Sequence, residues 1–467
     1  MNAQQALKEK LYAQGCNATP VHMLSAAGRG FLLKDAIGDT YTGFVFICKG
    51  SYAKMHYIVK DLRRLARLLV NNLEKDPDYF IKLKKIYNTG LEKLRKFYSN
   101  LDQLKFDKLS EKELLDLIKK AMDAVELSVG VGHAIEPFAL TTDIKIKQEL
   151  SKYIKDPKEL NKNFTLLTSP VKKSFVNEAE ELLAKIAKTK DERLIEKYLK
   201  EFGWIRNSYA GKQYITKDDV LKEIDSFKGK KPTDFNKIIN EKQALIKELN
   251  LPKNIVIKIK ATEFMVSWQD ERKKEILIAI DYLDRLLMEL SKKWNMNIQL
   301  LRYAKLDEIN EDLKNKKNTL AEREKGSIYV YFPKKTVILT GKEYKDALKQ
   351  LEKGYKSEVK ELSGMTASAG TATGPVKVCI TINDLSKVKQ GDILVASMTR
   401  PEFVPSMKKA AAVITDEGGI TCHAAIVSRE LGIPCIIGTK IATKVLKDND
   451  LVQVKGNHGL IIILKKD

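Results

Sequence analysis

The feature of this sequence that most constrains its fold is an abrupt change of character near Ser363. The next twelve residues, 364–375, carry almost no charge and consist largely of Gly, Ala and Thr, and short apolar runs follow them. The preceding three hundred residues are rich in charge and show helical periodicity instead. A chain of 467 residues is long enough for two to four domains. We therefore predict a domain boundary at this change, which divides the chain into an uncertain N-terminal segment at 1–55, a helical region at 56–361 and a compact C-terminal domain at 362–467.

The region before the boundary has the patterns of amphipathic helices. Apolar residues recur at helical spacing over 62–73 and again over 276–290, where charged residues at 271–274 precede the stripe. Ser110 and Glu113 match a capping box, which marks the start of a helix. Trp268 and similar aromatic positions on these stripes are interpreted as core residues.

Strands are expected at few places before the boundary and at many places after it. The runs 43–48 and 327–332 read as short strands within the helical part. After the boundary, one helix at 423–431 is expected among strands at 376–382, 392–396, 413–415, 435–437, 451–454 and 460–464. The predicted fold class is a multidomain protein with a large, mainly α-helical N-terminal region and a C-terminal α/β domain.

Charge and cysteine content exclude several classes of protein. The formal net charge is +22, of which residues 362–467, with 13 basic and 9 acidic side chains, contribute only +4. The remaining +18 is spread over helices that mix Lys with Glu, so a nucleic-acid partner is not favoured. Five cysteines without a Cys-x-x-Cys pair fit a reducing compartment. With no secretory signal and no apolar run that could span a bilayer, we expect a cytoplasmic protein without a membrane partner.

His423 is the one histidine of five whose neighbours suggest chemistry. The predicted strand ends at Thr415, Gly418 and Gly419 form a turn without side chains, Thr421 stands at the expected N-cap, and His423 lies in the first helical turn. Glycines admit a bulky anion, and the helix N-terminus stabilises negative charge and keeps an imidazole neutral. On spacing alone, a purely structural histidine at a helix start remains the favoured interpretation.

Three sequence blocks, at 364–376, 391–407 and 415–438, favour a functional role for His423 instead. In this order they resemble the swivelling phosphohistidine domain of the phosphoenolpyruvate-utilising enzymes, such as phosphoenolpyruvate synthase, pyruvate phosphate dikinase and rifampicin phosphotransferase. The resemblance implies that His423 is phosphorylated and then donates the group. The ATP-grasp domain and the (β/α)8 barrel of these enzymes have no counterpart in this sequence. The segment 200–350 is loosely similar to the family's helical linker, through 202–206, 268–272 and 301–308.

The resemblance also marks supporting positions around His423. It places Gly418, Gly419, Cys422, Ala424 and Arg429 in the phosphate loop or beside it. Thr421 matches a threonine that regulatory kinases modify in the family, although a simple N-cap role is the favoured interpretation. Arg429 could instead only complement the dipole of its short helix.

Metal binding is not expected in this chain. A zinc site of Cys422, His423, Cys435 and His458 would have poor chelate geometry and an unusual spacing. Asp416 and Glu417 could assist proton transfer or hold a substrate-bound Mg²⁺. Surface acids that form a turn are the favoured interpretation of these two residues.

The expected function is that of a phosphoryl carrier in a phosphoenolpyruvate synthase-like system. His423 would accept a phosphoryl group from ATP, held with Mg²⁺ by a separate ATP-grasp protein, or from phosphoenolpyruvate, and pass it to a small-molecule acceptor. The chain would then be a phosphotransferase that is incomplete without its partner. Two alternatives stay open: a stand-alone phosphotransferase whose helical region binds the acceptor, and a non-catalytic interaction module that keeps the swivel fold. The sequence does not identify the acceptor, the transferred phosphoryl of ATP or the oligomeric state.

Overall fold

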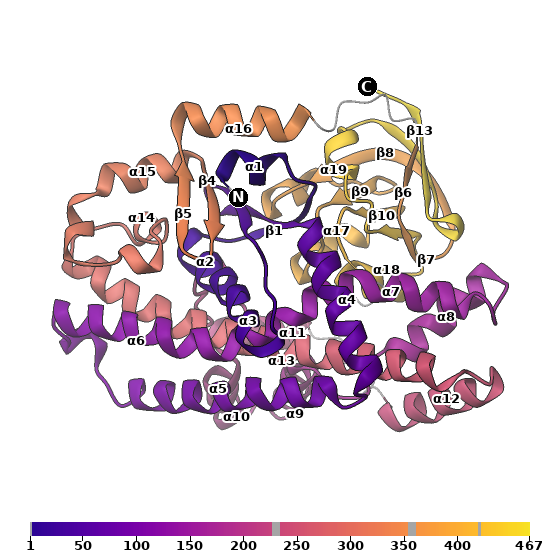
Figure 1. Ribbon diagram of the computed structural model, residues 1–467, viewed down its shortest axis with the longest axis horizontal. Coiled ribbons are helices and arrows are strands. Elements are labelled where there is room, and N and C mark those ends of the chain that lie inside the picture. The colour runs from indigo at the N-terminus through magenta and orange to yellow at the C-terminus, as the bar shows by residue number, and fades with distance from the viewer. Residues whose placement is uncertain (1, 227–233, 354–360, 419–421) are drawn as a thin grey trace.

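Long helices form one side of the molecule and two β-sheets lie on the other, as Figure 1 shows. This computed structural model describes residues 2–226, 234–353, 361–418 and 422–467. The C-terminal domain, in yellow, lies at one end, next to helices α7 (Ile135–Leu150) and α8 (Pro157–Thr168). This position matters because the candidate functional site lies on the side of the C-terminal domain that faces the helical region.

Helix α13 (Lys253–Lys293) runs through the helical layer with 41 residues. Its buried face includes Trp268 and Ile280, as the apolar spacing predicted. The capping box predicted at Ser110 is confirmed, because its hydroxyl and backbone exchange hydrogen bonds with Glu113 where α6 begins. The other helices around α13 are α4 (Val59–Lys75), α5 (Tyr79–Leu101), α6 (Glu111–Val129), α9 (Phe175–Thr189), α10 (Glu192–Phe202), α11 (Lys217–Ser226), α12 (Phe235–Glu248), α14 (Ile298–Leu301) and α15 (Lys317–Lys325).

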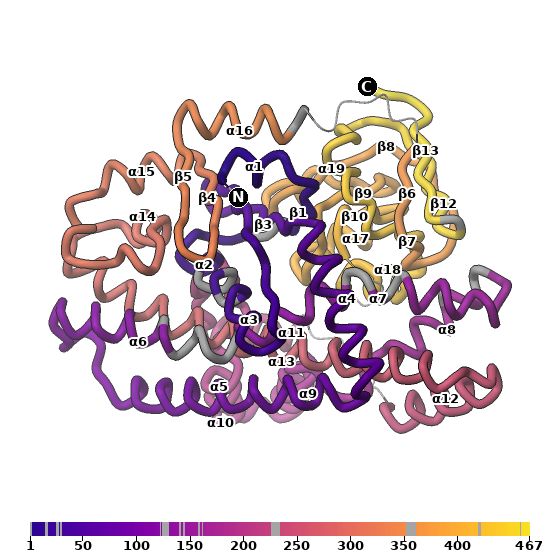
Figure 2. The backbone as a smooth tube through the Cα atoms, viewed as in Figure 1, coloured from indigo at the N-terminus to yellow at the C-terminus, as the bar shows by residue number. Residues whose placement is uncertain are grey.

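A five-stranded antiparallel sheet joins the start of the chain to a hairpin some 270 residues later. Its order is β1-β3-β2-β4-β5, with β1 (Leu11–Asn17), β2 (Phe44–Lys49), β3 (Tyr52–Ile58), β4 (Ser327–Phe332) and β5 (Lys335–Leu339). The sequence predicted β2 and β4 but not the other three strands. In Figure 2 the indigo and orange segments of this sheet lie side by side. Short helices complete this part: α1 (Ala3–Lys8), α2 (Pro20–Gly28), α3 (Leu33–Ile37) and α16 (Gly341–Lys353).

The C-terminal domain is built on an eight-stranded sheet in the order β6-β13-β12-β8-β9-β10-β11-β7. Strands β8 to β11 are parallel to one another, while the outer strands pair antiparallel. All six predicted strands are present, and the structure adds β6 and β7. Their bounds are β6 (Glu361–Ser363), β7 (Met365–Ser368), β8 (Thr371–Cys379), β9 (Ile393–Ala396), β10 (Ala412–Thr415), β11 (Cys435–Ile437), β12 (Leu451–Lys455) and β13 (Leu460–Lys465), with helices α17 (Val404–Met407), α18 (His423–Leu431) and α19 (Ala442–Val445).

Parallel strands β9 and β10 are buried along their whole length, which explains their uninterrupted apolar sequences. The loops that follow adjacent parallel strands emerge at the same edge of the sheet. The segments after Ala396 and Thr415 therefore meet at this edge, where α18 begins. No helix in the described part of the chain is long and apolar enough to cross a membrane.

Candidate functional site

His423 is the first residue of helix α18, which runs to Leu431 as the sequence predicted. Cys422 is the N-cap residue, and Gly432 ends the helix in the left-handed conformation. The predicted N-cap at Thr421 is therefore wrong by one position. Gly419 and Thr421 themselves lie outside the described residues. His423 is half-buried, so its ring meets both protein and solvent.

The imidazole of His423 is held by a threonine from the neighbouring loop. Thr399 Oγ1 lies 2.8 Å from His423 Nδ1, and Thr399 itself is buried. Thr399 follows strand β9 and His423 follows strand β10, so the parallel pairing of these strands brings the two residues together. The contact occupies Nδ1 and orients the ring. Sequence reasoning missed Thr399.

Asp416 and Glu417 are buried, at 5% and 2% exposure, so their interpretation as surface acids is wrong. Ser397 donates its hydroxyl to Glu417 Oε1 over 2.8 Å. Asp416 Oδ1 accepts hydrogen bonds from the Thr439 hydroxyl and the Thr443 backbone, and the Thr443 hydroxyl also donates to this carboxylate. Burial raises the pKa of Asp416 and these donors partly offset the rise. Both acids thus fix the loop that carries His423.

Gly418 has a backbone conformation that disfavours any other residue. Its φ is +111°, and a Cβ atom there would lie 2.6 Å from Cys422 Sγ. Burial raises the pKa of the Cys422 thiol, so the thiol stays protonated near neutral pH. Gly418 and Cys422 therefore shape the turn before the helix and bring no charge to it.

Two further positions marked by the resemblance have different environments. Ala424, in the first turn of α18, is buried in the core of the domain. Arg429 donates from Nη1 to Thr165 Oγ1 in α8 over 3.1 Å, and from Nε to the Ala425 carbonyl. Burial lowers the pKa of Arg429. Arg429 therefore links the C-terminal domain to the helical region, beyond any effect on the helix dipole.

The N-terminal sheet also reaches this loop. Tyr12 of strand β1 is half-buried, and desolvation together with the charge of Glu417 raises the pKa of its hydroxyl. Gln14 and Asn17 of the same strand line the space in front of His423. The first segment of the chain, whose role the sequence left open, thus forms part of the wall around the site.

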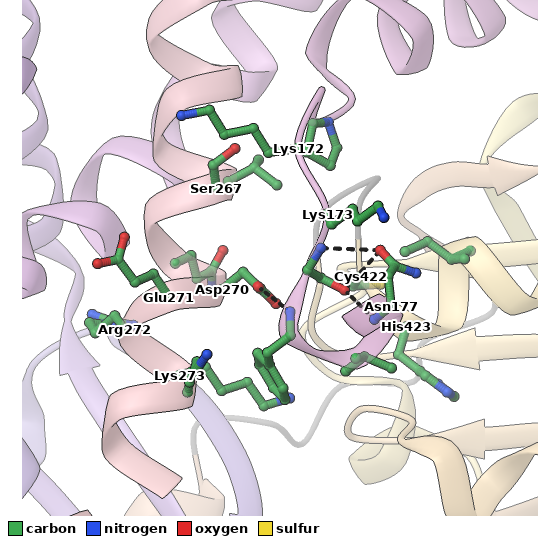
Figure 3. A pocket seen from close by; sticks show the side chains of 18 of the residues that line it. Lys172, Lys173, Asn177, Ser267, Asp270, Glu271, Arg272, Lys273, Cys422 and His423 are labelled. Carbon is green, nitrogen blue, oxygen red and sulfur yellow. Dashed lines mark hydrogen bonds between the residues drawn. The ribbon is translucent and has the colours of Figure 1, made fainter. Parts of the chain in front are cut away.

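His423 faces a cavity of about 2320 Å³ between the C-terminal domain and the helical region. This exceeds the ~300–1,000 Å³ of an ordinary small-molecule pocket. Figure 3 shows Cys422 and His423 on the C-terminal side, and Ser267 to Lys273 of α13 on the far side. Lys173, just before α9, and Asn177, in the first turn of α9, lie between them. Residues of two linker-like motifs, 202–206 and 268–272, contribute to the wall.

Other histidines have structural surroundings. His22 contacts Asp284 over 3.1 Å in the core, and His56 is buried against the Val45 carbonyl. Burial lowers the pKa of His56 to about 3. Among the described residues, no group of three or more His, Cys, Asp and Glu side chains is arranged to hold a metal ion.

Comparison with known proteins supports the assignment of the C-terminal domain. Residues 388–459 match the family model of the PEP-utilising enzyme mobile domain. The phosphoenolpyruvate synthase of Pyrococcus furiosus is 49% identical over 140 residues, which cover 30% of this chain and 17% of that protein. A probable phosphoenolpyruvate synthase of Archaeoglobus fulgidus is 49% identical over 138 residues, or 30% of this chain and 18% of the relative. An uncharacterised phosphotransferase of Bacillus subtilis is 39% identical over 138 residues, or 30% and 16%.

These matches cover less than a fifth of each relative's length. They show that the chain contains a mobile domain of the phosphoenolpyruvate-utilising enzymes and is related to phosphoenolpyruvate synthases in that part. The mainly helical remainder makes up most of the chain.

Proposed function

We propose that the chain is a phosphoryl carrier in a phosphoenolpyruvate synthase-like phosphotransfer system, with His423 as the residue that carries the group. The Nε2 lone pair attacks the phosphorus atom of the donor and forms an N–P bond. The P–O bond to the leaving group breaks, and the leaving group departs with that electron pair. In the second half-reaction an acceptor oxygen attacks the same phosphorus, and Nε2 recovers its electron pair.

The contact between Thr399 and His423 Nδ1 is the observation that carries this proposal. For Nε2 to be the nucleophile, the ring proton must reside on Nδ1, and Thr399 Oγ1 then accepts its hydrogen bond. The N-terminus of α18 adds backbone dipoles that favour the negative charge of a phosphoryl group at this end of the helix. Gly418 leaves room for the group, while Cys422 and Ala424 support the helix start.

The donor in this proposal is ATP with Mg²⁺ on a separate ATP-grasp protein, or phosphoenolpyruvate. The chain then has a helical docking region at 56–361 and a swivelling domain at 362–467, with 1–55 as part of the docking wall. Thr421 remains a proposed regulatory site, and Gly419 part of the proposed phosphate loop. The cysteines Cys48, Cys379, Cys422 and Cys435 are free, which is compatible with a cytoplasmic location.

A second candidate is a phosphotransferase whose own helical region binds the acceptor. The observation that favours it is the cavity in front of His423, which the helices α9 and α13 share with the C-terminal domain. An acceptor bound in this cavity would lie in the space that His423 faces.

The experiment offers labelled donors to the purified chain. Wild type, His423→Ala and His458→Ala are incubated with γ-labelled ATP, β-labelled ATP and labelled phosphoenolpyruvate, with and without extract of the source organism. Acid-labile, alkali-stable label that requires extract and is lost only in His423→Ala supports the carrier. Label that forms without extract supports the second candidate, and label that persists in His423→Ala contradicts both.

A further inference from the structure

Two cations face the cavity from opposite walls, Lys273 on α13 and Arg400 in the loop after β9. Arg400 directly follows Thr399, which holds the ring of His423. Figure 3 shows Lys273 on the α13 side, across the cavity from His423. The two cations thus belong to different parts of the chain, the helical region and the C-terminal domain.

Several other cations of the cavity wall are already paired with acidic neighbours. Their ion pairs are Lys84 with Glu271, Lys173 with Glu181, Arg206 with Glu223, Lys242 with Glu263, Arg272 with Glu136 and Lys274 with Glu178. Lys273 and Arg400 form no ion pair with any residue in the described part of the chain. Their positive charge is therefore available to a ligand in the cavity.

The electrostatic surroundings of Lys273 disfavour its charge. Burial is the largest cause that lowers the pKa of Lys273, and the charge of Arg400 lowers it further. Asp270 and Glu402 act in the opposite direction but do not cancel the effect. Asp270 also accepts a hydrogen bond from the Phe175 backbone over 3.1 Å. The Lys273 side chain is exposed to solvent, and Arg400 is half-buried.

Two like charges held near each other repel, as the effect of Arg400 on the pKa of Lys273 indicates, and an anion between them removes the repulsion. A tetrahedral oxyanion with several acceptor oxygens matches both groups, because guanidinium binds two oxygens in a fork and ammonium donates to a third. The cavity is large enough to hold such a group on a bigger molecule.

We propose that Lys273 and Arg400 together form a binding site for a phosphate-type oxyanion at the boundary between the helical region and the C-terminal domain. The inference rests on the proposed function only for one of its two sources, the phosphoryl group on His423. The other source is a phosphate group on a diffusible ligand. In both cases the anion holds the C-terminal domain against α13.

The first experiment needs no phosphohistidine and so remains informative if the proposed function fails. Inorganic phosphate is titrated calorimetrically, at constant ionic strength, into wild type, His423→Ala, Lys273→Gln, Arg400→Gln and the control Lys260→Gln. Lys260 lines the same cavity on the same helix and also lacks an ion pair among the described residues. We expect affinity to fall at least tenfold in Lys273→Gln and Arg400→Gln and to persist in His423→Ala and Lys260→Gln.

The second experiment tests the covalent source. Phosphoramidate phosphorylates histidine chemically, and ³¹P NMR then follows hydrolysis of the phosphohistidine, with His423→Ala as the background. Faster hydrolysis in Lys273→Gln and Arg400→Gln than in Lys260→Gln supports the site even if free phosphate does not bind. Lys273→Arg should keep the wild-type behaviour. If neither phosphate affinity nor phosphohistidine lifetime depends on Lys273 and Arg400, the proposal is overturned.

Discussion

Replacing Thr399 with Val removes the hydrogen bond to His423 Nδ1 while keeping nearly the same side-chain volume. Because Thr399 is buried, solvent does not readily replace the lost hydroxyl. A hydrogen bond of this kind contributes about 0.5–1.5 kcal/mol net, which corresponds to a rate effect of about 2- to 13-fold. The proton then shifts more easily from Nδ1 to Nε2, so less imidazole has a nucleophilic Nε2. We expect phosphorylation of His423 to slow by that factor.

The assay measures the rate of phosphohistidine formation with phosphoramidate, which needs no partner protein. Thr399→Ser keeps the hydroxyl and should restore most of the rate, whereas a merely structural role would not distinguish Ser from Val in this way. Ser406→Ala serves as the control, since it removes another buried hydroxyl of the same domain that bonds the Leu385 carbonyl. A Thr399→Val rate equal to wild type, or a Thr399→Ser rate as low as that of Thr399→Val, would refute the reasoning.

Three further predictions concern stability and docking. Gly418→Ala should lower the free energy of unfolding in urea by about 1–3 kcal/mol, and by more than Gly391→Ala does. Both glycines have positive φ, but an added Cβ atom would meet open space at Gly391 and the Cys422 side chain at Gly418. Equal losses of stability in the two variants would contradict this prediction. Arg429→Met, which loses the contact to Thr165, should increase hydrogen exchange in α8 with little change in global stability, and unchanged exchange would count against a docking role. The pKa of His56 is about 3 when folded against 6.5 as a free side chain, so the unfolded chain takes up a proton first as pH falls. Stability should therefore drop below pH 6.5, by up to about 1.4 kcal/mol per pH unit from this group, and urea unfolding of His56→Gln should show a weaker drop.

The C-terminal domain was predictable because its elements are short, local and strongly patterned. Strands such as β10 and β11 are continuous apolar runs bounded by polar or glycine residues, and the helix at His423–Leu431 follows the sequence pattern directly. The antiparallel sheet of the first part was missed for the opposite reason. Strand β1 pairs with β3 across more than thirty residues, and β2 pairs with β4 across nearly three hundred, so no local pattern predicts these partners.

The acids of the site were misread because their hydrogen-bond donors come from other loops. Asp416 accepts hydrogen bonds from Thr439 and Thr443, and Glu417 Oε1 accepts one from Ser397, all about twenty residues or more away. A sequence alone shows two acids after a strand, which usually face water.

The partner of His423 could have been found from the sequence. Once 392–396 and 413–415 are taken as adjacent parallel strands, the loops after them must meet at one edge of the sheet. Thr399 is a hydroxyl residue just after the first of these strands, and His423 follows the second. By contrast, the pairing of Lys273 with Arg400 depends on how the two parts of the chain pack, which no periodicity encodes.

The most direct test of the account is to identify which nitrogen of which residue carries phosphate. The chain is phosphorylated with its native donor system, kept at alkaline pH, and examined by ³¹P NMR together with peptide mapping of the modified residue. The account predicts a single Nε2-phosphohistidine at His423. Phosphate on Nδ1 of His423, or on a different residue while His423 stays unmodified, would contradict it.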